Sequence, residues 1–173
     1  MTEEQPYTVL TKNDGFEVRH YPDYVLVQVD VTGDFMRAGN IAFGPLVSYI
    51  SGNNVAGKKI AMTAPVLQET LGEETHTVSF VLPAGMKISD VPVPTNARVS
   101  TVHVAAHDAA AMKFGGGWNG DRFQENGELL LKKVHEAGLN AVGNVYYARF
   151  DPPWKPWFLK RNEVLLALAP SAS

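Results

Sequence analysis

The sequence contains no cysteine, and this absence excludes several kinds of chemistry. Disulfide bridges, thiolate zinc sites, iron–sulfur clusters and a cysteine nucleophile all require the thiol group. Charged residues are also sparse, at 19% of the 173 residues, and lysine and arginine form no run of three. Because nucleic-acid binding depends on a concentrated basic face, a chain with a net charge of −3 is expected to have no nucleic-acid partner.

Long apolar segments are missing as well. No uncharged apolar stretch approaches the about 20 residues that a membrane helix needs. The acidic start, with Glu3 and Glu4, is the opposite of the basic and then apolar order of a signal peptide. We therefore expect a cytoplasmic protein without membrane insertion. An apolar fraction of 45% lets residues 1–173 bury roughly two-thirds of their unfolded surface as a single domain.

Two strands and a helix are predicted near the start of the chain. Phe16, Val18 and His20 share one side of the first strand, the alternating valines of 25–31 mark the second, and this strand pair ends near Thr32. A helix then follows, with Asp34 as its cap, Gly52 just beyond its end, and an apolar stripe. The stripe consists of Met36, Phe43, Val47 and Ile50. Pro45 predicts a kink near Ala42 or a later start of this helix.

The remaining elements predict a tandem repeat. Strands are expected at about 60–68 and 77–82, and a Pro-rich connection follows. The second half then gives strands at about 98–104 and 110–114, a helix at 121–137, and strands at 144–150 and 163–168. The inward stripe of this helix consists of Phe123, Gly127, Leu130, Val134 and Ala137. Two strand–helix–strand–strand units, at about 7–90 and 97–170, predict an α+β domain with two helices on a curved antiparallel sheet.

Four segments, in one order along the chain, resemble the SOUL haem-binding family. They are Phe16–Tyr21 (FEVRHY), Lys59–Val66 (KIAMTAPV), Val78–Pro83 (VSFVLP), and Asp151–Pro156 (DPPWKP) with the nearby Arg161–Val164. The resemblance covers nearly the whole sequence. It implies a SOUL/GyrI-like barrel that binds haem or another tetrapyrrole and acts as a carrier or buffer.

The same resemblance implies His20 as an iron ligand. A histidine in the matching Arg-His-Tyr context is proposed as the axial ligand within the family, and a neutral imidazole on an apolar wall suits an iron porphyrin. The alternative is a partly buried histidine that is hydrogen-bonded to the backbone. Sequence alone leaves both interpretations open.

An apolar groove over the first helix is the second implied feature. The matching wall consists of Met36, Asn40, Phe43 and Val47. Lys155 would reach a haem propionate, and Arg37 could replace the arginine that the family carries where this chain has Asn40. Alternatively, the apolar stripe of this helix packs in the protein core and binds no ligand.

Other motifs give weaker signals. Residues 52–59 nearly match a phosphate-binding loop, but Lys59 stands where a hydroxyl is needed and the loop runs from helix to strand. His103 and His107 have zinc-like spacing, yet in one strand they would lie about 13 Å apart, so surface histidines are expected.

Glu163 leaves a choice between two classes of protein. Paired with Arg161 or Arg149 it would be structural, whereas a lone buried carboxylate would suit the cleft of a GyrI-like module for amphipathic small molecules. No serine–histidine–acid set or metal set is visible, which favours a binding protein over an enzyme, although activity on tetrapyrroles stays open.

Overall fold

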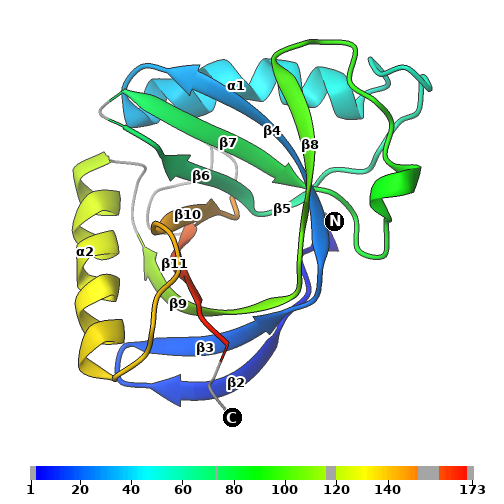
Figure 1. Cartoon of the computed structure of the whole chain (residues 1–173). Helices are drawn as coiled ribbons and strands as arrows, with labels where there is room; N and C mark the ends of the chain where they lie inside the picture. The colour runs from blue at the N-terminus through cyan, green and yellow to red at the C-terminus, as the bar shows by residue number, and fades with distance from the viewer. Residues whose placement is uncertain (1–2, 73, 116–119, 152–159, 171–173) are drawn as a thin grey trace. The chain divides into compact units, whose positions relative to one another are not determined.

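The computed structural model of the chain describes residues 3–72, 74–115, 120–151 and 160–170. The chain forms two compact units, one of residues 1–5 and 23–105 and the other of residues 6–22 and 106–173. Each contains one helix and a largely antiparallel sheet, so the α+β class is confirmed (Figure 1). Among the described residues, no helix is long and apolar enough to cross a membrane.

The first unit has four main strands, one helix and three short elements. They are β1 (Glu3–Glu4), β4 (Tyr24–Thr32), α1 (Phe35–Ile50), β5 (Thr63–Ala64), β6 (Val66–Thr70), β7 (Thr75–Val81), the 3-10 helix η1 (Ile88–Asp90) and β8 (Val99–Val104). The antiparallel order is β6-β7-β4-β8, and β1 pairs in parallel with β5. Pro65 separates β5 from β6, as its restricted geometry predicts.

The second unit has five strands and one helix. They are β2 (Thr8–Asn13), β3 (Phe16–Tyr21), β9 (His107–Gly115), α2 (Gly120–Glu136), β10 (Tyr146–Arg149) and β11 (Arg161–Leu168). Their order is β2-β3-β9-β11-β10, and every pairing is antiparallel.

The two units repeat one topology. In the series β4-α1-β6-β7, the last strand, β7, lies between β4 and β6. In the series β9-α2-β10-β11, the last strand, β11, likewise lies between β9 and β10, so the expected tandem order is confirmed. One expectation is wrong: β3 and β4 do not form a strand pair. Instead, β3 pairs with β2 and β9, whereas β4 pairs with β7 and β8. Sequence adjacency suggested a strand pair that the sheet register does not contain.

Helix α1 begins where its cap predicts. The Asp34 carboxylate accepts a hydrogen bond from the Arg37 backbone N–H at 2.8 Å, and Gly52, with φ 114°, follows the end of the helix. The helix continues through Pro45, so the prediction of a later start is wrong.

The inward face of α1 also differs from the predicted stripe. The buried residues are Ala38, Ala42, Leu46, Tyr49 and Ile50, and they pack on the inward valines of β4. Of the four predicted stripe residues, only Ile50 is buried. Small alanines let the helix lie close to the sheet, and the bulkier Met36, Phe43 and Val47 therefore remain outside the buried stripe.

Helix α2 follows its prediction more closely. Phe123, Gly127, Leu130 and Val134 are buried, whereas Ala137 is exposed beyond the helix end. Gly127 lies against Tyr147 of β10, since a Cβ built there would come within 2.6 Å of the Tyr147 hydroxyl. The Tyr147 ring is fixed by an edge contact with Phe123, whose centroid is 5.2 Å away. Only glycine allows this close approach.

We expect Gly127→Ala to lower the free energy of unfolding by about 1–3 kcal/mol, because the new methyl group overpacks a buried contact. Gly44→Ala is the matched control, since a Cβ at this α1 position meets nothing within 4 Å. It should raise stability by up to about 1 kcal/mol through helix propensity. Urea unfolding of both variants checks the opposite signs, and equal shifts would contradict the close-packing argument.

Candidate functional site

One flank of α1 carries the residues that the sequence assigned to a ligand wall. Met36 and Val47 are half-buried, whereas Asn40 and Phe43 are exposed. We call these four residues the α1 flank. The buried stripe of α1 is formed by other residues, so the α1 flank borders the core without being fully buried in it.

Phe43 and Val47 of the α1 flank pack on buried apolar residues. Phe43 is 44% exposed, but its inner edge packs on the buried Phe80 of β7, with ring centroids 5.6 Å apart. Val47 and, on β6, Val66 also pack against the core cluster while remaining partly accessible. Within the first unit the α1 flank therefore presents an ordered apolar strip. Arg37, exposed on the same helix, places a cation beside it.

His20 lies on β3 of the second unit and is held by a carboxylate. Its Nδ1 lies 2.8 Å from Asp108 Oδ1, and the two side chains are 45% and 33% exposed. Because a carboxylate only accepts, Nδ1 carries the proton, and in the neutral imidazole Nε2 has the lone pair. This arrangement matches the carboxylate–histidine pairing that orients metal-binding imidazoles.

The surroundings of His20 differ from the expected apolar wall. Along β3, Phe16, Arg19 and Tyr21 are buried, whereas Val18 and His20 are only half-buried. The imidazole bonds a side chain and not the backbone. Asp108 was missed because the contact joins residues 88 positions apart through the β3–β9 register, which no local pattern reveals.

The structure brings together only part of the predicted site. The α1 flank and Arg37 share one helix of the first unit, whereas His20 belongs to the second unit. Lys155 lies outside the described residues.

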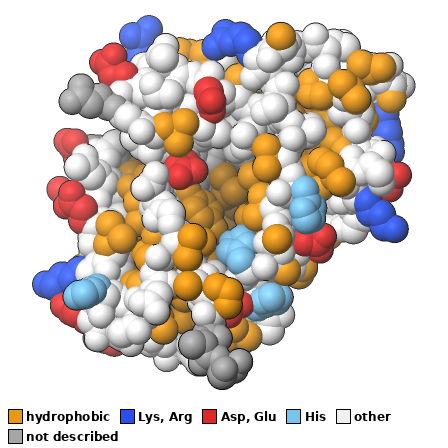
Figure 2. All heavy atoms as spheres, viewed as in Figure 1, with side chains coloured by type: hydrophobic (Ala, Val, Ile, Leu, Met, Phe, Trp, Pro, Cys, Tyr) orange, Lys and Arg blue, Asp and Glu red, His pale blue; other side chains and the backbone are white. Residues whose placement is uncertain are grey.

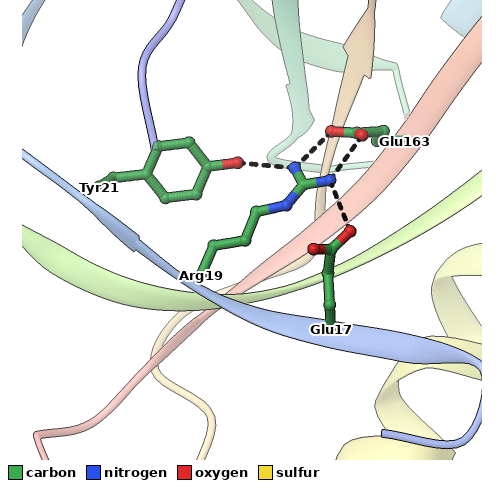
Figure 3. A network of polar contacts seen from close by, with 4 residues as sticks. All are labelled: Glu17, Arg19, Tyr21 and Glu163. Atoms are coloured by element: carbon green, nitrogen blue, oxygen red, sulfur yellow. Dashed lines mark hydrogen bonds and ion pairs between the residues drawn. The ribbon is translucent and has the colours of Figure 1, made fainter. Parts of the chain in front are cut away.

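The second unit contains a buried polar network around Arg19 (Figure 3). Arg19 Nη1 and Nη2 each donate to one oxygen of Glu163 over 2.7 Å, and Nη1 also donates to the Tyr21 hydroxyl over 2.9 Å. Glu17 accepts a longer bond of 3.3 Å from Nη2. The ring of Tyr7 lies 4.0 Å from the guanidinium carbon and adds a cation–π contact.

Small residues on β9 allow this network to form. Strand β9 separates β3 from β11, and the register places Ala109 opposite Arg19, Lys113 opposite Glu163 and Ala111 between them on the same face. Side chains larger than those of Ala109 and Ala111 would block the guanidinium from reaching Glu163. The pair therefore depends on register, since a slip of one residue would turn Arg19 to the opposite face.

Burial and charge act against each other at Arg19. Burial alone would lower the Arg19 pKa, but its bonds and attraction to Glu163 and Tyr21 dominate, so the pKa lies above its ordinary value. Burial also raises the pKa of Tyr21, although the Arg19 charge opposes this shift. The network thus keeps a charged guanidinium and a neutral tyrosine in the interior.

The network shows that Glu163 forms a structural ion pair, but its partner is Arg19. Arg161 and Arg149 were the wrong candidates. Arg149 stands opposite Asn162 in the β10–β11 register and hence on the other face of the sheet from Glu163. There, burial lowers the pKa of Arg149 to about 10. Both oxygens of Glu163 are engaged by Arg19, so this carboxylate is not a lone acid.

The other histidines do not form a metal site. His103 lies 3.1 Å from Asp23 in the first unit, and His107 stacks on Tyr21 in the second. His76, which the sequence did not single out, is buried and bonds Thr70 and the Gly33 carbonyl. In the described parts of the chain, no three His, Asp or Glu side chains are grouped to hold a metal.

Solved structures share this fold at low sequence identity. The C-terminal domain of EcmrR has a TM-score of 0.68 at 10% identity, covering 90% of this chain and 98% of that chain. A hydrolase from Listeria innocua has a TM-score of 0.60 at 11% identity, covering 92% of this chain and 94% of that chain. Identities this low support the fold alone.

Sequence relatives are closer in identity. Heme-binding protein 2 of Homo sapiens is 29% identical over 164 residues, covering 86% of this chain and 80% of that protein. Its counterpart in Mus musculus is 28% identical over the same length. The family model described as SOUL heme-binding protein matches residues 2–167. Because this match spans nearly the whole chain, the protein belongs to the SOUL heme-binding protein family.

Proposed function

We propose that this protein binds haem or a related tetrapyrrole and acts as a carrier or buffer, with the macrocycle against the α1 flank. The observation that carries the proposal is the accessibility of this flank: α1 buries Ala38, Ala42 and Leu46 and leaves Phe43 accessible. Family membership supplies the ligand class.

The α1 flank fits the chemistry of haem. A porphyrin is a flat apolar disc, and burying it against aromatic and aliphatic groups contributes about 25 cal/mol per Å². The edge contact with Phe80 holds Phe43 in place, so little side-chain freedom is lost on binding. Arg37 supplies a charge for a propionate, and Lys155 is proposed as a second.

We expect Phe43→Ala to weaken haemin binding by roughly tenfold, because it removes the largest apolar group of the flank. Ile41→Ala is the matched control: Ile41 is 47% exposed, similar to Phe43, but lies on another side of the helix. It should leave affinity unchanged. Titration of haemin, followed through the Soret band, measures both dissociation constants.

Equal affinities for the two variants would contradict the α1 flank as the binding wall. Arg37→Gln provides a second check, since losing a propionate contact should weaken binding by a few-fold and reduce its salt dependence. Absence of saturable haemin binding by the wild type would overturn the proposed function itself.

His20 is proposed as an axial iron ligand through Nε2. The support is its hydrogen bond to Asp108, which fixes the tautomer that leaves Nε2 available for a metal. His20 is thus proposed to bind the iron, whereas the α1 flank is proposed to contact the porphyrin ring.

We expect His20→Ala to shift the Soret band of bound haemin, and added imidazole to restore it. His103→Ala is the control, since the His103 side chain is also 45% exposed and also faces an aspartate. Asp108→Ala should weaken iron coordination about 10–100-fold through loss of orientation. An unchanged spectrum for His20→Ala would remove the axial role and leave the α1 flank untouched.

Glu163 gives no support to the alternative of a GyrI-like cleft for amphipathic small molecules, because Arg19 already neutralises it. We expect Glu163→Gln to lower the free energy of unfolding by about 3–5 kcal/mol, since it leaves a buried charge without its partner. Glu17→Gln, which removes only the 3.3 Å contact, should cost less than about 1 kcal/mol. Urea unfolding distinguishes the two losses.

A double replacement tests the structural role of the pair directly. Arg19→Met combined with Glu163→Met should recover much of the stability lost in Glu163→Gln, because no unpaired charge remains. Unchanged stability in Glu163→Gln, together with saturable binding of crystal violet that competes with haemin, would favour the alternative function.

A further inference from the structure

Val55 and Val93 are the two most exposed large hydrophobic residues in the described ranges, and they lie side by side. They are 70% and 63% exposed. Although they belong to different loops of the first unit, the Val55 N–H donates to the Val93 carbonyl over 2.9 Å. A single exposed valine is ordinary, but two adjacent ones form a shared apolar area. We call residues 51–60 and 91–99 the double loop.

Buried polar groups hold the double loop in shape. The Asn54 amide donates to the Tyr49 and Lys58 carbonyls and accepts from the Lys58 N–H. The Tyr49 hydroxyl donates to the Pro92 carbonyl over 2.5 Å, which ties the second segment to α1. Thr95 donates to the Asn53 carbonyl and joins the two segments once more. The valines are therefore held outward on an ordered base.

The charge of the double loop is opposite to that of the whole chain. It contains Lys58, Lys59 and Arg98, all exposed, and no aspartate or glutamate, whereas the chain carries −3. Asp90, just before the second segment, is accompanied by Lys87 three residues earlier. Figure 2 shows hydrophobic side chains at the upper right, near the loop that follows α1, with lysine or arginine side chains along the adjoining edge.

We propose that the double loop docks on a membrane surface that contains anionic phospholipid. The two valines enter the boundary between headgroups and acyl chains, and the three cations contact lipid phosphates. Apolar tips surrounded by cations match this boundary, where apolar contact and negative charge occur together. The attachment is peripheral, and it uses none of the residues assigned to haem.

Vesicle flotation tests this proposal. The wild type should float with phosphatidylcholine vesicles that contain phosphatidylserine, should not float with phosphatidylcholine alone, and should be released by salt. Lys58→Gln and Lys59→Gln should each weaken binding about fivefold. Val55→Ser and Val93→Ser should each weaken it about tenfold.

Two matched controls should bind as the wild type does. Val142→Ser alters a valine that is 52% exposed in the second unit, and Lys132→Gln removes a lysine whose side chain is 72% exposed on α2. Failure of the wild type to float with phosphatidylserine, or flotation of the loop variants at wild-type strength, overturns the proposal. Salt-independent self-association that the valine variants abolish would instead identify a protein interface. Haemin titration of the same variants keeps this test separate from the proposed function.

Discussion

The ion pair between Arg19 and Glu163 is the constraint on which the second unit depends. It joins residues 144 positions apart, and the Arg19 and Glu163 side chains are only 0% and 2% exposed. Removing two charges from water costs several kcal/mol per ion, which only close bidentate contact and further hydrogen bonds offset. Such a pair adds little net stability, but it strongly disfavours every register that separates its members. The order β3-β9-β11 and the alanines of β9 follow from this requirement.

In the first unit, by contrast, helix α1 packs on the sheet through a cluster of buried apolar residues. Helix α1 approaches the sheet through Ala38 and Ala42, and the larger apolar side chains of the neighbouring flank are half-buried or exposed. Phe43 is accessible in this arrangement: its inner edge touches Phe80, and the rest of the ring faces outward. An apolar surface that is ordered without being buried offers apolar contact area to a flat apolar ligand. The close packing of α1 on the sheet therefore also leaves the apolar surface that is proposed to bind the ligand.

Local patterns in the sequence predicted what local physics determines. The Asp34 cap, the Gly52 terminus and four of the five residues of the α2 stripe were confirmed, because capping and helical period act within a few residues. The α1 stripe was predicted wrongly because large apolar residues outweighed alanines in the pattern, whereas close packing selects the small ones. Strand β2 was missed, since all six of its residues are exposed and show no alternation. The partners of Glu163 and His20 depend on register between distant strands, so no spacing rule could identify them.

The two parts of the proposed haem site make different physical demands. Burial of the ring is non-directional, and it depends on apolar area, so the binding proposed for the α1 flank does not require a metal in the porphyrin. Iron coordination is directional, and it needs an imidazole whose tautomer and orientation are fixed, which Asp108 provides for His20. A site of this kind derives affinity mainly from the ring and electronic tuning mainly from the ligand. Under this proposal, loss of the axial histidine would therefore leave the tetrapyrrole bound, whereas loss of the apolar flank would remove both ring binding and iron coordination.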